Sequence, residues 1–201
     1  MTEPSRNRRT VAAYDDYAEK YAEVTRDRLP IGDEALAHFA DALGPGARVL
    51  EVASGPGWDA DELERRGLHV RRTDLSEGFI AVQRRRGKVV EPLDLVSDDL
   101  GGPWEGLMAL YVLQHIERGG MEGVIRRIVA ALRPGGLFLT SFQEGEGEWR
   151  QTGSEGGTYT MICWRPADML DLMAGCGLEV DWSHSFEGDE ARWTILIARR
   201  P

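Results

Sequence analysis

One stretch of the sequence decides the fold: Val49-Leu50-Glu51-Val52-Ala53-Ser54-Gly55-Pro56-Gly57. Its first part is short and mostly apolar, as expected of a buried strand, and its last part is a glycine-bearing turn that leads into a helix predicted over 58–66. Glycine has no side chain to block a ligand and tolerates positive φ, so the backbone can approach a bound molecule closely at such a turn. The free N–H groups of the next helix then lie beside that molecule. The turn therefore predicts a binding crevice at the carboxyl end of the first strand.

Outward from this turn, strand-like and helix-like segments alternate along the chain. This pattern predicts a mostly parallel sheet covered by helices. The clearest helix begins near Met121, where apolar residues recur at the spacing of a core-facing stripe. We expect helices at 33–43, 58–66, 76–85, 121–132 and from 166 to about 175, and strands at 47–52, 69–73, 88–93, 106–111, 137–142, 178–182 and 193–198.

Residues 143–158 interrupt the alternation. They include five glycines and four glutamates and have no apolar periodicity. Because a long segment without regular structure in a compact domain is usually functional or disordered, we expect a flexible loop here. No internal repeat or second domain is evident, so a single domain over 1–201 is predicted, with 1–32 forming an N-terminal helical region that covers the site.

Composition limits the partners. The 201 residues carry a formal net charge of −10, with 42% hydrophobic and 29% charged residues, as expected of a folded globular domain. Duplex DNA or RNA would be repelled by this charge, because the clusters of arginine are short and have no aromatic residues between them. We therefore expect a small-molecule acceptor as the partner and no nucleic acid.

The sequence also predicts a cytoplasmic protein without a membrane partner. No apolar run approaches the roughly 20 residues that span a bilayer, and the polar N-terminus is not typical of a secretory signal. Cys163 and Cys176 form neither a CxxC pair nor a zinc set, and we expect reduced, buried thiols. No HExxH or other tight metal-ligand cluster occurs, so no metal is predicted.

Asp74 lies at the end of the predicted second strand, 19 residues after Gly55. A carboxylate at that place can accept hydrogen bonds from both hydroxyls of a ribose, which indicates an adenosine-containing ligand. Gly55-x-Gly57-x-x-Ala60 formally satisfies the nicotinamide fingerprint, so an NAD(P)-dependent oxidoreductase is one alternative. Against it, Glu51 can face a cationic amino group such as that of a methionine moiety, and a rigid proline separates the two glycines.

Several segments together resemble the class I, Rossmann-like, S-adenosylmethionine-dependent methyltransferases. Residues 51–57 look like motif I of this family, an acid followed by GxGxG, with Ala53 in place of the first glycine. In order along the chain, the similar segments are Tyr14–Tyr21 (the N-terminal helix), Glu51–Gly57, Thr73–Ser76, Pro92–Leu95, Leu110–Ile116 and Leu132–Gly136. The resemblance covers nearly the whole chain.

The resemblance implies an α/β fold of three layers, a doubly wound, seven-stranded, mostly parallel sheet with the last strand antiparallel. It also implies S-adenosylmethionine as cofactor and S-adenosylhomocysteine as product, with Asp74 at the ribose and Asp94 at the adenine amino group. The residues implied in cofactor binding are Glu51, Ala53, Gly55, Gly57, Asp74, Leu75, Asp94, Leu95, Leu110, Tyr17 and Tyr21. Those implied or suggested in binding the acceptor are Tyr14, Tyr111, His115, Arg150 and Tyr159.

Methyl transfer from a sulfonium is an in-line displacement, so a protein contributes mainly proximity and alignment. A general base is needed only where the acceptor, an oxygen or a nitrogen, loses a proton during attack. His115, just past the fourth strand, is the candidate for that base. Besides the oxidoreductase, one further alternative stays open: a relative that binds S-adenosylmethionine without methylating, because Ala53 departs from the motif.

Overall fold

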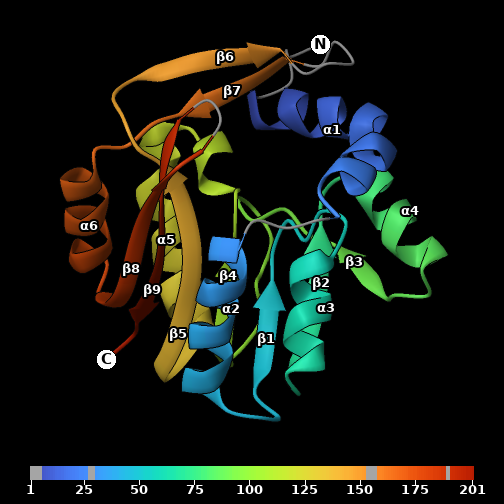
Figure 1. Ribbon diagram of the computed structural model, residues 1–201. Coiled ribbons are helices and arrows are strands. Elements are labelled where there is room, and N and C mark those ends of the chain that lie inside the picture. Colours follow the sequence, from blue (N-terminus) through green and yellow to red (C-terminus); the bar gives the residue numbers. More distant parts are fainter. Residues whose placement is uncertain (1–5, 27–29, 153–157, 189–190) are drawn as a thin grey trace.

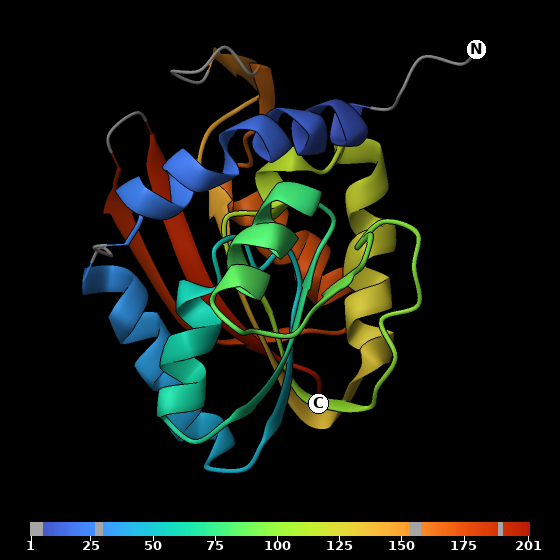
Figure 2. The same cartoon turned by 90° about the vertical axis from the view of Figure 1, so that its right-hand side faces the viewer.

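A seven-stranded sheet forms the middle of three layers in the computed structural model, which describes residues 6–26, 30–152, 158–188 and 191–201 (Figures 1 and 2). Its order is β3-β2-β1-β4-β5-β9-β8. Neighbouring strands are parallel except that β9 runs antiparallel to β5 and β8, which confirms the predicted fold class. The bounds are β1 Arg48–Glu51, β2 His69–Asp74, β3 Val90–Pro92, β4 Trp104–Ala109, β5 Leu132–Gln143, β8 Glu179–Glu187 and β9 Arg192–Arg199.

Helices cover both faces of the sheet. The exception is α1, which packs against α4 beyond the end of the sheet toward which β1 points (Figures 1 and 2). One face packs against α2 and α3, and the other against α5 and α6. The helices are α1 Arg6–Val24, α2 Pro30–Leu43, α3 Trp58–Arg65, α4 Glu77–Arg85, α5 Met121–Ala131 and α6 Pro166–Gly175, with short 3-10 turns η1 Leu113–His115 and η2 Arg118–Gly120.

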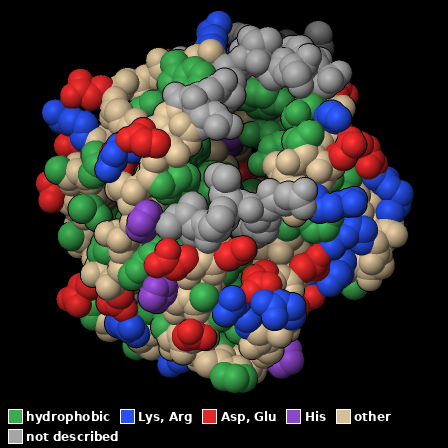
Figure 3. All heavy atoms as spheres, viewed as in Figure 1, with side chains coloured by type: hydrophobic (Ala, Val, Ile, Leu, Met, Phe, Trp, Pro, Cys, Tyr) green, Lys and Arg blue, Asp and Glu red, His purple; other side chains and the backbone are tan. Residues whose placement is uncertain are grey.

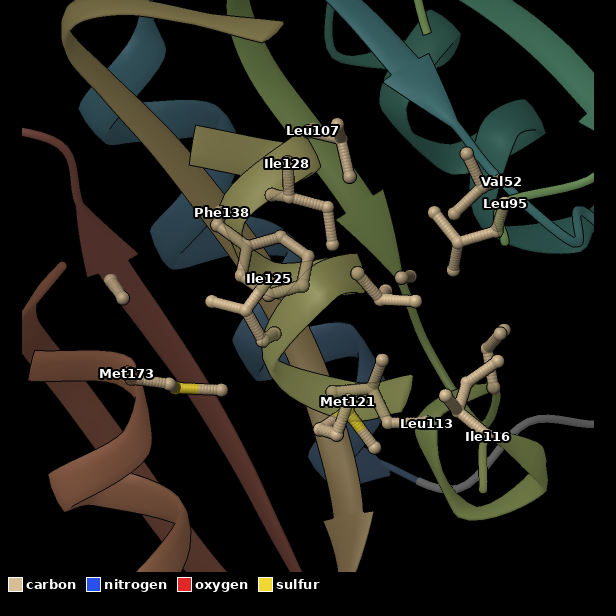
Figure 4. Close-up of a cluster of buried hydrophobic side chains, with 14 of the residues drawn as sticks. Val52, Leu95, Leu107, Leu113, Ile116, Met121, Ile125, Ile128, Phe138 and Met173 are labelled. Carbon is tan, nitrogen blue, oxygen red and sulfur yellow. The ribbon is translucent and has the colours of Figure 1, made fainter. Parts of the chain in front are cut away.

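The predicted stripe of α5 forms the centre of the larger core cluster. Met121, Ile125 and Ile128 are fully buried; Ile125 and Ile128 lie toward Phe138 of β5 and Leu107 of β4, and Met121 lies toward Leu113 (Figure 4). Each such side chain contributes roughly 1.5–3 kcal/mol when it is taken from water. The helix ends at Ala131, one residue before the predicted end, because the next residue already pairs with β4.

The structure differs from the expected loop over 143–158. Residue 143 ends β5, and β6 (Glu148–Thr152) pairs antiparallel with β7 (Thr158–Ile162). The side-chain oxygen of Gln143 accepts from the Trp149 indole N–H of β6 and from the thiol of Cys163, which follows β7. β6 has no apolar alternation and so gave no strand signal in the sequence. Residues 153–157 lie outside the described part of the chain.

Both cysteines, Cys163 and Cys176, are buried free thiols, in keeping with the sequence-based expectation. Within the described residues, none of the helices combines the length and the apolar character that crossing a bilayer requires.

Candidate active site at the carboxyl ends of the strands

A pocket opens where β1, β2 and β4 end, beneath α1. In Figure 3 the surface beside α1 is hollowed, and hydrophobic side chains gather around the hollow. Eleven of the predicted site residues line this pocket: Ala53, Gly55, Asp74, Leu75, Asp94, Leu95, Leu110 and Tyr21 from the cofactor set, and Tyr14, Tyr111 and His115 from the acceptor set. The fold thus brings together segments that are far apart in the sequence.

Three predicted cofactor residues lie close by without lining the pocket. Glu51 is buried beneath the turn and accepts a 2.5 Å hydrogen bond from the Ser54 hydroxyl. Gly57 faces away from the pocket, because a Cβ there would lie 2.3 Å from the side-chain oxygen of Gln83. Tyr17 packs edge-on against Tyr21. Glu51 and Gly57 therefore pack behind the turn, and Tyr17 lies on α1 beside the pocket-lining Tyr21.

The two predicted acceptor residues on the hairpin are placed differently. Tyr159, on β7, is buried and packs against the ring of Tyr14, with ring centroids 4.7 Å apart. Arg150, on β6, is exposed and lines a separate groove with Glu148 and Trp149. Arg150 lies on strand β6 and not in a loop beside the pocket, and it does not line the pocket. The structure therefore gives no support to a role of Arg150 at the acceptor.

Asp74 forms the polar centre of the pocket. The backbone N–H of Gly55 donates to Oδ2 at 2.7 Å, and that of Ser76 donates to Oδ1 at 2.8 Å. Burial raises the pKa of Asp74 to about 6, although the backbone N–H groups favour the charged form. The carboxylate is therefore fixed in orientation and faces a cavity, as a pair of ribose hydroxyls requires.

Two residues that are not glycine adopt positive φ at the pocket wall. Ala53 has φ 50° and Tyr111 has φ 56°. Such backbone costs about 1–3 kcal/mol and persists only where the surroundings enforce it. At Tyr111 the N–H donates to the Ser141 hydroxyl at 2.8 Å, and the Gln114 amide donates to the carbonyl at 2.6 Å. The strain places both residues at the ligand-facing wall.

The start of α3 is acidic, which bears on the cofactor class. Asp59, in its first turn, lines the pocket. A dinucleotide would bring its pyrophosphate to the N-terminus of this helix, where a carboxylate would repel it. A cofactor with a sulfonium and an ammonium group suits such a wall better.

His115, which also lines the pocket, meets α1 and β7. Its Nε2 lies 3.1 Å from the Tyr14 hydroxyl, and its Nδ1 lies 3.4 Å from the Thr160 carbonyl oxygen. Because a carbonyl only accepts, Nδ1 carries the proton and the Tyr14 hydroxyl donates to Nε2. Burial lowers the pKa of His115 to about 4, so the imidazole is neutral near pH 7. A neutral imidazole can accept a proton.

Aromatic contacts and one carboxylate hold α1 over the pocket. The Tyr14 ring contacts Tyr21 and Phe79 as well as the hairpin. Asp15 accepts hydrogen bonds from the Ser76 hydroxyl at 2.6 Å and from the Gly78 backbone N–H at 3.1 Å. Sequence reasoning missed Asp15, because nothing in the pattern of an amphipathic helix marks one surface carboxylate as a bond to another helix.

Gln83 and Arg72 are further residues that the sequence did not indicate. Gln83 is fully buried in α4, and its amide donates to the Ser54 hydroxyl and the Gly55 carbonyl at 2.9 and 2.8 Å. Arg72, buried in β2, donates to the Gln83 side-chain oxygen and the Gly57 carbonyl at 3.1 and 3.2 Å. The only available signal was an arginine in a strand with a buried pattern, where a charge requires partners.

The fold and this pocket define the class of the Rossmann-like methyltransferases. A family profile described as a methyltransferase domain matches residues 19–181. The chain belongs to this family, and the resemblance predicted from the sequence is confirmed. Family membership also decides against the nicotinamide-dependent oxidoreductase.

Curated relatives and solved structures agree with this assignment. The demethylmenaquinone methyltransferase of Clavibacter sepedonicus is 30% identical over 142 residues, which cover 64% of this chain and 55% of that protein. The ubiquinone biosynthesis O-methyltransferase of Xylella fastidiosa is 29% identical over 48% of this chain and 42% of that protein. The chain spans between about a third and about half of the curated relatives it matches.

Among solved structures, magnesium protoporphyrin IX methyltransferase from Synechocystis PCC 6803, which contains bound S-adenosylmethionine, superposes with a TM-score of 0.77. The alignment covers 100% of both chains at 14% identity. At this identity the similarity establishes the shared fold alone.

Proposed function

We propose that the protein transfers the methyl group of S-adenosylmethionine to an oxygen or nitrogen of a small, uncharged acceptor and releases S-adenosylhomocysteine. One observation carries the proposal: a single pocket joins an oriented carboxylate, Asp74, to a neutral imidazole, His115. The bound cofactor would supply an electrophilic methyl group on a sulfonium. The acidic and aromatic walls fit such a cation.

The residues of the chain would divide the work by position. Asp74 and the Gly55 backbone would hold the ribose, and Asp94, which also lies 3.5 Å from Arg8, would face the adenine. His115 Nε2 would take the proton of an acceptor that loses one during attack, once that acceptor replaces the Tyr14 hydroxyl as its hydrogen-bond partner, while Thr160 holds Nδ1. Alignment of acceptor and cofactor can supply roughly 7–11 kcal/mol of barrier lowering.

The lining of the pocket supports an uncharged acceptor. Of the described residues that line it, none is Lys or Arg, so an anionic acceptor would find no counter-charge. Tyr14, Tyr111 and Phe79 provide aromatic surface instead. Two of the relatives are named for methylation in quinone biosynthesis, and a ring of that kind fits this surface.

Thermal unfolding with S-adenosylmethionine, S-adenosylhomocysteine, NAD and NADP in parallel tests the cofactor. A ligand at 100 times its dissociation constant stabilises by about 2.7 kcal/mol, which for a domain of this size raises Tm by about 5–11 °C. We expect a rise with the two sulfur nucleosides only. A rise with NAD or NADP alone would overturn the proposal. Release of S-adenosylhomocysteine with neutral hydroxyarenes and amines, assayed next, would decide between methylation and a non-methylating relative.

A further inference from the structure

A hydrogen-bond network of four buried side chains runs behind the turn at residues 53–57, from Arg72 through Gln83 and Ser54 to Glu51. Arg72 Nη1 donates to Gln83 Oε1 at 3.1 Å, Gln83 Nε2 donates to Ser54 Oγ at 2.9 Å, and Ser54 Oγ donates to Glu51 Oε2 at 2.5 Å. All four residues are buried, between 0% and 8% exposed. None of the assigned roles of the pocket uses Gln83, which does not line it.

The direction of every hydrogen bond in this network follows from which groups can donate and which can only accept. A guanidinium only donates, so the amide oxygen of Gln83 must face Arg72. The Gly55 carbonyl only accepts, and it lies 2.8 Å from Gln83 Nε2, so the amide nitrogen must face the turn. Since Ser54 Oγ accepts from that amide, its own proton is left to donate to the Glu51 carboxylate.

At the Arg72 end of the network, ion pairs hold the guanidinium in place. Arg72 donates to Asp61 at 2.6 Å and lies 2.7 Å from Glu64, and both carboxylates also contact Lys88. The guanidinium therefore has little freedom to turn, and Gln83 is held between it and the turn. The Gly57 position confirms how closely these groups pack, because a Cβ there would lie within 2.7 Å of Arg72 and closer still to Gln83.

We propose that Gln83 is a positioning residue for the aminoacyl end of the cofactor. It sets the Ser54–Gly55 backbone from behind and, through the Ser54 hydroxyl, fixes the orientation of the Glu51 carboxylate. This inference rests on the proposed placement of the cofactor, in which Glu51 lies on the side of the methionine moiety and Asp74 on the side of the ribose. Gln83 contacts no ligand itself, and it acts through the turn.

Two ligands that differ only in the aminoacyl part test this role. S-adenosylhomocysteine carries it, and 5′-methylthioadenosine lacks it. We would measure both dissociation constants by titration calorimetry for the native protein, Gln83→Glu and Gln83→Leu. Gln83→Glu keeps the acceptor for Arg72 but removes the donor to Ser54 and Gly55, and Gln83→Leu removes both. Should Gln83→Leu fail to fold, the nearly isosteric Gln83→Glu still gives the answer.

The expected result is a loss of about tenfold in affinity for S-adenosylhomocysteine and less than about threefold for 5′-methylthioadenosine. Glu64→Gln is the matched control, since it also alters a partner of Arg72, by removing its charge, at a residue with no contact to the turn, and it should leave both constants unchanged. Equal losses for the two ligands, or no loss, would overturn the role of Gln83. A native protein that binds neither ligand, or both equally, would instead overturn the placement of the cofactor and this inference with it.

Discussion

Asp74 and His115 line one pocket and are held in different ways. Asp74 accepts two backbone hydrogen bonds of 2.7 and 2.8 Å from turns that follow β1 and β2. His115 is held by longer contacts, of 3.1 and 3.4 Å, from Tyr14 and Thr160 on two segments far from it in the sequence. The part of the pocket around Asp74, which we name the cofactor end, is fixed by backbone geometry. The part around His115, the acceptor end, is fixed by the way α1 and β7 pack.

This difference teaches where the pocket can change. Directional bonds from consecutive strand–turn–helix units leave the cofactor end little freedom, because Asp74 and Gln83 hold the Ser54–Gly55 turn by hydrogen bonds of 2.7–2.9 Å. Aromatic rings, by contrast, tolerate shifts in position, since they pair either offset-stacked or edge-to-face over centroid separations of roughly 4.5–7 Å. One fold can therefore keep the cofactor and exchange the acceptor by altering α1 and the β6–β7 hairpin.

The largest expected effect would break the cofactor end. In Gly57→Ala the new Cβ would lie 2.3 Å from Gln83 and 2.7 Å from Arg72, at φ +82°. We expect destabilisation by about 2–4 kcal/mol, because strain at positive φ adds to overlap with buried partners. Urea unfolding measures it. Gly87→Ala is the control, since φ is +77° there but nothing lies within 4 Å. Equal losses at both positions would show that the overlap is relieved at no cost.

Asp74 gives the next largest effect, through pH. Because burial raises the pKa of Asp74 to about 6, this carboxyl is almost fully ionised above about pH 7 and loses its charge as pH falls through 6. In the proposed placement, the charged form accepts from the ribose hydroxyls. Affinity for S-adenosylhomocysteine should fall about tenfold between pH 7 and pH 5, as one proton is bound. Titration calorimetry across this range checks it.

The same range separates the two ends of the pocket. His115 has a pKa of about 4, so it contributes no such step above pH 5. Asp74→Asn should bind weakly and without this pH dependence. A native affinity that stays constant down to pH 5 would mean that Asp74 does not hold the cofactor.

The sequence predicted the cofactor end of the pocket better than the acceptor end. The strand, the turn and Asp74 were predictable because a local pattern of apolar residues, glycines and one acid encodes them. β6 was mistaken for part of a loop because it shows no apolar alternation, and its pairing partner β7 lies beyond residues 153–157. The contact of Tyr14 with His115, 101 residues apart, depends on where α1 packs. No periodicity encodes such a contact.

A smaller effect is expected at the acceptor end. Tyr14→Phe keeps the ring contacts but removes the hydroxyl that donates to His115 Nε2. Loss of one hydrogen bond of this kind costs about 0.5–1.5 kcal/mol. Because that donor favours the neutral imidazole, its removal should also raise the pKa of His115, which NMR titration of the ring protons measures. Tyr17→Phe, on the same helix, is the control. An unchanged histidine pKa in Tyr14→Phe would contradict the assigned hydrogen bond.

The smallest effect should have the opposite sign. Ala53→Gly places glycine where the family motif has it and where φ is 50°. Relief of the strained conformation, about 1–2 kcal/mol, is partly offset by the greater freedom of glycine in the unfolded chain, about 0.4–1 kcal/mol. We therefore expect a small gain in Tm, with affinity for S-adenosylhomocysteine nearly unchanged. Ala130→Gly, at an exposed position in α5, should lose about 1 kcal/mol, because no strain is relieved there. If Ala53→Gly loses as much as this control, the methyl group of Ala53 contributes packing that outweighs its strain, and the cofactor end then depends on its side chains as the acceptor end does.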